Sequence, residues 1–91
     1  MSVSVHIPSA LRPECGGAAT VDVSASTVRA ALKQLEKDHP ALYRSVCDET
    51  DSVRQHINLF VNWSLVNRRD GLDATLAPGD SLSIMTAVSG G

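Results

Sequence analysis

The chain opens with an alternation of hydrophobic and polar residues that is typical of a β-strand. Val3, Val5 and Ile7 are separated by serine and histidine, so one face of the strand is apolar. A second, shorter alternation at residues 21–23 predicts a partner strand. The segment between them, residues 8–17, holds two prolines and a Gly-Gly pair and is expected to be a long loop. Together these features predict a hairpin.

The next segment has the spacing of an amphipathic helix. Thr27 is a suitable N-cap, and apolar residues then recur at i, i+3, i+4 and i+7 with charged residues on the opposite face. Pro40 disfavours helical geometry in the residue before it, so the helix should end there, with residues 41–47 adding one or two turns. The acidic stretch 48–52 reads as a loop. The apolar residues form a stripe that must pack against another part of the fold: Val28, Ala31, Leu32 and Leu35.

The second half of the chain returns to strand patterns. Residues 57–62 predict a third strand, and residues 65 and 66 predict a short edge strand. A turn at residues 77–80, with proline where a turn needs a fixed φ, leads to a last strand marked by Leu82 and Ile84. One helix can cover one face of one sheet, so the order of elements predicts an α+β roll.

Composition and charge narrow the functional classes. The 91 residues are 43% hydrophobic and 20% charged, which fits one small globular domain. A net charge of −2 disfavours nucleic acid as a partner, and apolar runs of at most three residues exclude a membrane span. Residues 1–10 show no secretory signal, so a cytoplasmic location is expected. Neither the two cysteines nor the three histidines have the spacing of a metal site or a disulfide framework.

The last residues of the sequence carry candidate chemistry. After Val88 the sequence reads Ser89, Gly90 and Gly91. Glycines lack a Cβ and pass through a channel too narrow for other residues, and four extended residues reach about 13 Å. The Gly91 carboxylate is then an anion that can attack an activated phosphate and become an acyl donor. The alternative is a frayed terminus, which tolerates any small residue. The ending alone favours neither the functional interpretation nor the frayed one.

The second half of the chain shows an extended pattern of residues: Val61-Asn62, Val66, Arg68, Gly71-Leu72, Thr75-Leu76, Gly79-Asp80, Leu82, Ile84 and Ala87 to Gly91. In the order and spacing of these positions, the chain resembles the ubiquitin-like β-grasp sulfur-carrier family, which includes the small subunit of molybdopterin synthase and the carriers of thiazole and cysteine biosynthesis. The resemblance extends over the whole chain. The segment around Leu11 and Arg12 is most similar to the longer carriers of cysteine or specialised-metabolite sulfur transfer. The resemblance implies a β-grasp domain at residues 1–87, with a mixed four- to five-stranded sheet under one main helix, and a flexible tail at residues 88–91.

The resemblance also implies a function. The chain would be a protein cosubstrate, not an enzyme: an ATP-dependent activating enzyme adenylates Gly91, sulfur replaces AMP, and the thiocarboxylate is delivered to a sulfur-accepting biosynthetic enzyme. Val88, Ser89 and Gly90 would thread into those enzymes, and a metalloprotease that processes the tail is a further partner. The chain itself would bind no cofactor. Cysteine or a sulfur-containing metabolite is favoured as the product over molybdopterin.

Two other functions share these features of the sequence. A ubiquitin-like modifier would join Gly91 to lysines of other proteins through isopeptide bonds, and the same tail allows it. A binding domain that acts through its sheet face would not need Gly90 and Gly91 at all. The three hypotheses therefore differ in what they require of the terminal carboxylate.

Four residues near the third strand are candidate docking residues. Because neighbouring residues of a strand point to opposite faces, Phe60 should lie opposite Leu59, on the face that the helix leaves uncovered. We expect Phe60 and Trp63 to contact a partner; packing of Phe60 under the acidic loop is the alternative. Arg68 and Arg69 could pair with acidic residues of the activating enzyme or simply form a solvated turn.

Other reactive or polar residues are expected to be structural. Cys15 precedes Gly16-Gly17 and could form a thioester or mixed disulfide, but no neighbour lowers its pKa, so a bystander role is favoured. Cys47 should be a small buried hydrophobic residue. Asp80 follows Pro78-Gly79 and should serve the turn.

Overall fold

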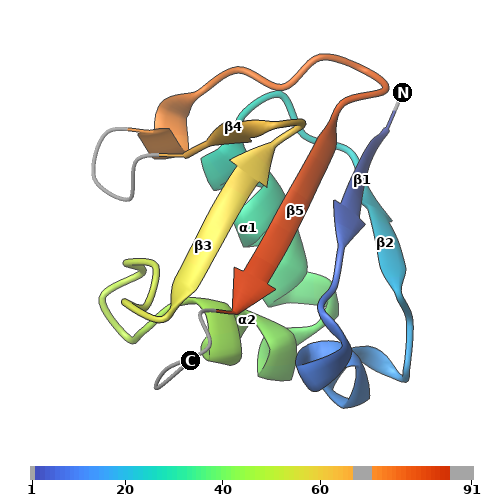
Figure 1. Ribbon diagram of the computed structural model, residues 1–91, viewed down its shortest axis with the longest axis vertical. Coiled ribbons are helices and arrows are strands. Elements are labelled where there is room, and N and C mark those ends of the chain that lie inside the picture. The colour runs from blue at the N-terminus through green and yellow to red at the C-terminus, as the bar shows by residue number, and fades with distance from the viewer. Residues whose placement is uncertain (1, 67–70, 87–91) are drawn as a thin grey trace.

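One mixed sheet with helices on one side forms the body of the molecule. The structure is a computed structural model, and it describes residues 2–66 and 71–86 (Figure 1). Five strands lie in the order β2-β1-β5-β3-β4, and both α-helices lie on the same face of the sheet (Figure 1). Within these residues no helix is long and apolar enough to cross a membrane. The α+β class expected from the sequence is confirmed.

The N-terminal hairpin forms one side of the sheet. Strand β1 (Val3–His6) pairs antiparallel with β2 (Thr20–Val23), as the two alternating patterns predict. On its other edge, β1 pairs in parallel with the last strand, β5 (Ser81–Thr86). Because the two strands run in the same direction, their C-terminal ends lie at the same end of the sheet (Figure 1).

The C-terminal half completes the sheet around β5. Strand β3 (Ile57–Val61) pairs antiparallel with β5 over five residue pairs, and β4 (Ser64–Leu65) pairs with the end of β3. Strand β5 therefore has a hydrogen-bonded neighbour on each edge, whereas β2 and β4 are the edge strands.

Two consecutive helices cover one face of the sheet. Helix α1 (Val28–Asp38) begins at the predicted cap, where the Thr27 hydroxyl accepts a hydrogen bond from the Ala30 N–H at 3.1 Å. Helix α2 (Pro40–Val46) starts with proline in its first turn, where the missing N–H costs no hydrogen bond. The buried residues of α1 are those of the predicted stripe: Val28, Ala31, Leu32 and Leu35.

The hydrophobic core lies between the helices and the sheet. It collects the alternate strand residues that point toward α1 and α2, and among the described residues every buried side-chain nitrogen or oxygen atom has a hydrogen-bond partner. Its largest fully buried side chains are Leu35, Leu42, Ile57, Leu59, Leu82, Ile84, Val3, Val5, Val28 and Val46.

Two local predictions differ from the structure. The expected loop at residues 8–17 contains a 3₁₀ helix, Ser9–Cys15, which ends at Gly16 with φ 70°. A 3₁₀ turn of this length has no long hydrophobic periodicity, so only its prolines and glycines are visible in the sequence. The expected strand at residues 65 and 66 begins one residue earlier, and Val66 lies beyond β4 as a buried residue.

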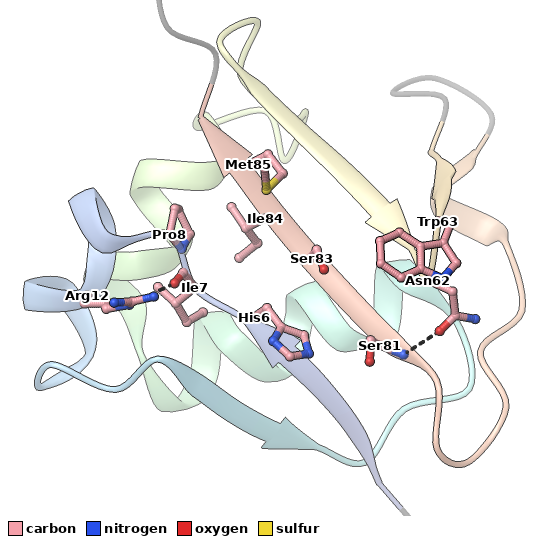
Figure 2. Close-up of a pocket in the computed structure, with 10 residues that line it drawn as sticks. All are labelled: His6, Ile7, Pro8, Arg12, Asn62, Trp63, Ser81, Ser83, Ile84 and Met85. Atoms are coloured by element: carbon pink, nitrogen blue, oxygen red, sulfur yellow. Dashed lines mark hydrogen bonds between the residues drawn. The ribbon is translucent and has the colours of Figure 1, made fainter.

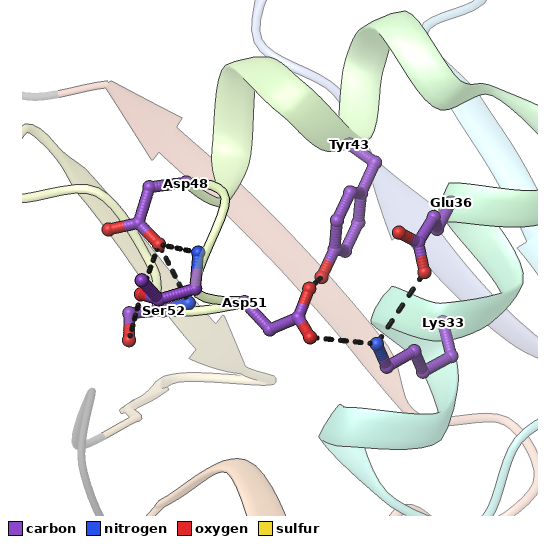
Figure 3. Close-up of polar contacts among 7 residues, drawn as sticks. Lys33, Glu36, Tyr43, Asp48, Asp51 and Ser52 are labelled. Carbon is purple, nitrogen blue, oxygen red and sulfur yellow. Dashed lines mark hydrogen bonds and ion pairs between the residues drawn. The ribbon is translucent and has the colours of Figure 1, made fainter.

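The acidic loop after α2 is fastened to the helices by polar contacts (Figure 3). The Tyr43 hydroxyl donates to one carboxylate oxygen of Asp51 at 2.7 Å, and the Lys33 ammonium donates to the other at 3.2 Å. Lys33 also pairs with Glu36 at 3.5 Å. The hydrogen bond from Tyr43, followed by that from Lys33, lowers the pKa of Asp51. Asp51 takes up φ 65°, an unusual backbone conformation that these contacts hold in place.

A second aspartate shapes the same loop from within. One oxygen of Asp48 accepts hydrogen bonds from the Thr50 hydroxyl at 2.6 Å, the Thr50 N–H at 2.8 Å and the Ser52 N–H at 3.2 Å (Figure 3). Donors to the charged form lower the pKa of Asp48, with the Thr50 hydroxyl as the largest cause. The carboxylate of Asp48 is therefore satisfied by donors of its own loop.

Candidate functional site

The face of the sheet opposite the helices is the candidate site. The described strand residues on this face are those that alternate with the core positions, and most of them are polar. In β5, Ile84 is 1% exposed in the core, whereas its neighbour Met85 is 51% exposed on the open face. In β1, His6 occupies the corresponding outward position. The alternation of residues along the strands therefore separates the core residues from the residues of the open face.

A groove of about 480 Å³ crosses this face (Figure 2). It extends from the segment that follows β1 to the turn between β3 and β4. The residues that define its two ends and its floor are His6, Arg12, Trp63, Ser81, Ser83 and Met85.

One end of the groove is apolar. Trp63 is 97% exposed, and together with Phe60 and Met85 it lines a smaller cavity of about 210 Å³. Phe60 pairs with Ser83 of β5 and is half-buried on the open face, so its predicted orientation opposite Leu59 is confirmed. Its alternative position under the acidic loop is not observed. An exposed aromatic residue beside a small apolar cavity can hold a side chain of another protein.

The turn that carries Trp63 is anchored to the start of β5. Asn62 has φ 55° and its side-chain oxygen accepts a hydrogen bond from the Ser81 N–H at 3.1 Å (Figure 2). Its side-chain amide donates to Asp80 at 3.3 Å. Asp80 in turn accepts from the Ala77 N–H at 2.8 Å, and this backbone hydrogen bond is the main cause of its lowered pKa. The predicted role of Asp80 in the turn is confirmed.

The other end of the groove is cationic, a feature that sequence reasoning did not assign. The Arg12 Nε donates to the Ile7 carbonyl at 3.1 Å, which holds the side chain beside the end of β1 (Figure 2). His6, the last residue of β1, lines the same groove. The alternation of His6 with Val5 and Ile7 carries the signal for His6, but the position of Arg12 depends on the 3₁₀ helix, which the sequence pattern does not reveal.

Both cysteines are buried, which confirms the expectation for Cys47. Cys15 is buried and its thiol lies within hydrogen-bonding distance of the Arg12 and Ala18 carbonyl oxygens, at 3.5 and 3.6 Å. Cys47 is 1% exposed, and burial raises the pKa of its thiol to about 11. The Cys47 thiol is therefore protonated at neutral pH and is a poor nucleophile. Among the residues that the structure describes, no group of His, Cys, Asp or Glu side chains is placed to hold a metal ion.

Several predicted site residues lie outside the described part of the chain. These are Gly91, which the sequence predicts to be reactive, its neighbours Val88, Ser89 and Gly90, and the docking candidates Arg68 and Arg69. The structure does show where the preceding described residue, Thr86, lies. It ends β5 at the same end of the sheet as Arg12 and the 3₁₀ helix.

A five-stranded mixed sheet covered on one face by helices, with a Gly-Gly sequence after the last strand, defines a ubiquitin-like β-grasp protein. The family model described as the ThiS family matches residues 5–91. The chain belongs to the ThiS family, and the expected β-grasp fold is confirmed by its similarity to solved members of the fold.

Full-length relatives agree with this assignment. The chain is 36% identical over 93 residues to the sulfur carrier protein CysO of Mycobacterium tuberculosis, and the match covers 100% of both chains. It superposes with a TM-score of 0.87 and 34% identity on a chain in the crystal structure of the Amycolatopsis orientalis BexX/CysO complex, covering 98% of this chain and 99% of that one. It is also similar to SAMP1 from Haloferax volcanii, with a TM-score of 0.83, 31% identity and 100% coverage of both chains.

Family membership settles one question about chemistry. Sulfur carriers such as CysO are cosubstrates of other enzymes, and the expectation that this chain is not itself a catalyst is confirmed by its place among them. Interaction with partner proteins is accordingly part of the function.

Proposed function

We propose that this protein is a sulfur carrier whose Gly91 carboxylate is converted to a thiocarboxylate. The observation that carries the proposal is the match to sulfur carrier proteins named CysO along the entire chain, at 36% identity. The family model reaches residue 91 and so includes the Gly-Gly sequence. A binding domain that needs only its sheet face would not require this ending.

The chemistry of the proposal acts on a single carboxyl group. A C-terminal carboxyl is ionised at neutral pH. Within an ATP-dependent activating enzyme, a Gly91 oxygen attacks the α-phosphate of ATP, and pyrophosphate leaves. Sulfide sulfur then attacks the acyl carbon, and AMP leaves with the bonding electron pair. Where the sulfur comes from a persulfide, the same attack gives an acyl disulfide, and a thiol must reduce its S–S bond to release the thiocarboxylate. The thiocarboxylate donates its sulfur to a biosynthetic enzyme, with cysteine or a sulfur-containing metabolite favoured over molybdopterin as the product.

The folded domain contributes to this reaction by positioning the Gly91 carboxylate. Binding through a large rigid surface brings the reacting carboxylate to the active site and lowers the entropic cost of reaction. We place the docking surface on the open face, at Phe60 and Trp63, and extend it to Arg68 and Arg69. Its partners are the activating enzyme, the sulfur-accepting enzyme and a metalloprotease that processes the tail.

Intact-protein mass spectrometry tests the proposal. The chain is purified from its native host, or produced together with its activating enzyme, ATP and a sulfur source. We expect a species heavier than the carboxylate form by the mass difference between sulfur and oxygen. A variant that lacks Gly91 is the matched control and should stay unmodified. Persistent absence of the heavier species in the presence of active enzyme would contradict the proposal.

A ubiquitin-like modifier is the second candidate, because the chain is also similar to the small archaeal modifier protein SAMP1. In that case Gly91 forms an isopeptide bond with a lysine amine, and the same activation precedes it. Stable lysine-linked adducts that persist after reduction and denaturation would favour the modifier. A free thiocarboxylate without such adducts would favour the carrier.

A further inference from the structure

Strand β2 is an edge strand whose outer side has no partner among the described residues. It is the outermost strand beside β1 (Figure 1). An edge strand carries a row of N–H and C=O groups with which another strand can pair. The opposite edge of the sheet offers a shorter row, because β4 has 2 residues and β2 has 4. Strand β2 is therefore the longer edge for the addition of a further strand.

The register of the N-terminal hairpin shows which backbone groups of β2 face outward. The Ile7 N–H donates to the Ala19 carbonyl at 2.8 Å, and Val21 lies two residues further along the same ladder. Because hydrogen-bonded pairs alternate along an antiparallel ladder, Val21 points its N–H and C=O groups toward β1. Thr20 and Asp22 point theirs away from β1. Within residues 2–66 and 71–86, no hydrogen bond engages these outward groups.

A second copy of the chain can pair with these outward groups in one symmetric register. When two β2 strands run antiparallel with Val21 opposite its counterpart, Thr20 of each copy lies opposite Asp22 of the other. Each such pair exchanges N–H···O=C bonds in both directions, and both pairs lie within β2. The edge is thus complementary to itself.

Neighbouring registers are less favourable. A shift by one residue brings outward groups against residues whose backbone groups are already bonded to β1. A shift by two residues in one direction places the Asp22 carboxylates directly opposite each other, where like charges repel. The opposite shift pairs Asp22 with Ala18, which lies outside β2. The register with Thr20 opposite Asp22 is therefore favoured.

The side chains of β2 agree with this register. Thr20 and Asp22 are exposed, and Val21 is half-buried against the core on the other face. In the symmetric pair each Thr20 hydroxyl lies opposite an Asp22 carboxylate, so a donor faces an acceptor. The two Val21 side chains meet as an apolar cross-strand pair. Each Asp22 has acceptor capacity for this contact, because its Oδ1 accepts from the Ser4 hydroxyl at 3.4 Å and its Oδ2 is engaged by no described residue.

We propose that two copies of this chain associate through β2, by antiparallel pairing of their edges around a two-fold axis. The axis is perpendicular to the sheet, so the two sheets become continuous and the helices of both copies lie on the same side. Stable interfaces bury about 1,200–2,000 Å² in total. Pairing along a single short strand buries less, so the dimer is transient and forms at roughly millimolar concentration. It depends on no chemistry at Gly91.

Exchange of amide protons with water, measured by NMR on the full chain, tests the pairing directly. The outward N–H groups of Thr20 and Asp22 are open to water in the monomer and become bonded in the dimer. Their exchange should slow roughly twofold or more when the protein concentration rises from about 0.05 to about 2 mM at constant pH. The Val21 N–H, which already bonds to β1, is the internal reference and should change less. Exchange rates of Thr20 and Asp22 that do not depend on concentration would overturn the inference.

Two substitutions at one position separate the backbone from the side chain. Asp22→Pro removes an N–H that faces away from β1, so the internal ladder is kept, and sedimentation equilibrium should show the monomer alone at about 2 mM. Asp22→Ala keeps the N–H and is the matched control; its dimerisation Kd should stay within about threefold of the wild-type value. Leu65→Ala, on the other edge strand, should leave the Kd unchanged.

The remaining outcomes each count for or against the pairing. An Asp22→Pro chain that folds, by circular dichroism, and dimerises like the wild type would overturn it. Loss of the dimer in Asp22→Ala would show that the side chain carries the contact, and loss in Leu65→Ala would place the contact on the other edge; either result contradicts the inference. If Asp22→Pro does not fold, the exchange rates of the wild-type chain decide.

Discussion

The two faces of the sheet are built from the same strands but differ in exposure and in the pairing of their charged groups. Ile84 and Met85 are adjacent in β5, yet the first is enclosed by the helices and the second borders an open groove. On the covered side, two carboxylates of the acidic loop have partners: Asp51 accepts from Lys33 and Tyr43 of the helices, and Asp48 accepts from donors of its own loop. On the open side, Arg12 keeps donors unpaired by any described residue, and Trp63 is almost fully exposed.

This difference separates stability from recognition. The covered face supplies the buried apolar area that holds the domain together, so substitutions there should act on the free energy of unfolding. The open face contributes little burial, so substitutions there should act on partner affinity. A cosubstrate that several enzymes handle benefits from this arrangement, because its contact surface can bind and release without changing the fold.

The adjacent residues of β5 give the sharpest test of the separation. Ile84→Ala leaves a cavity in the core and should lower the free energy of unfolding by about 2–5 kcal/mol. Met85→Ala removes a half-exposed side chain and should lower it by less than about 1 kcal/mol. Urea denaturation followed by circular dichroism measures both. Equal losses for the two variants would show that the open face is as important for stability as the core.

The contact between α2 and the acidic loop should have an intermediate effect. Tyr43→Phe keeps the buried ring but removes the hydroxyl that donates to Asp51, and we expect a loss of about 1 kcal/mol in the free energy of unfolding. Ser45→Ala, which removes an exposed hydroxyl of the same helix, is the matched control and should have no measurable effect. If Tyr43→Phe also weakened binding to the activating enzyme, the two faces would be coupled.

Acid should weaken the covered side through its aspartates. The pKa values of Asp48 and Asp51 are lowered in the folded protein, so their contribution to stability is complete above the unfolded pKa of about 3.9 and is lost as the pH falls below it. The free energy of unfolding should therefore decline below about pH 4. Asp51→Asn, measured over the same pH series, should decline less steeply. Identical slopes would remove Asp51 as a cause.

Trp63 should have the smallest effect on stability. Because its side chain is 97% exposed, Trp63→Ala should change the free energy of unfolding by less than about 0.5 kcal/mol while weakening partner binding. As the only tryptophan, it also reports docking directly. Its fluorescence should shift to shorter wavelength when the activating enzyme binds, and an unchanged spectrum in a saturated complex would place the contact elsewhere.

The sequence predicts the elements that depend on periodic burial. The alternation of Val3, Val5 and Ile7 and the stripe of α1 each follow from a repeated contact with one core, and both are confirmed. The outward orientation of Phe60 follows from the same period of two. These patterns could not reveal the parallel pairing of β1 with β5.

Contacts between residues that are far apart in the sequence could not be predicted from the periodic pattern of hydrophobic residues. Lys33 and Asp51 are 18 residues apart and meet because the loop folds back with Asp51 at φ 65°. Arg12 reaches the groove because a 3₁₀ helix replaces the expected loop. Each of these two contacts depends on an irregular backbone conformation, and such a conformation leaves no periodic pattern of residues in the sequence.

The central place of β5 has a mechanical consequence. The segment that we propose to be reactive follows Thr86, the last residue of a strand that is hydrogen-bonded to β1 on one edge and to β3 on the other. Tension applied to that segment along the strand would have to shear both ladders at once instead of opening them bond by bond. An enzyme can therefore draw the terminus into a narrow channel while the rest of the domain resists being pulled apart.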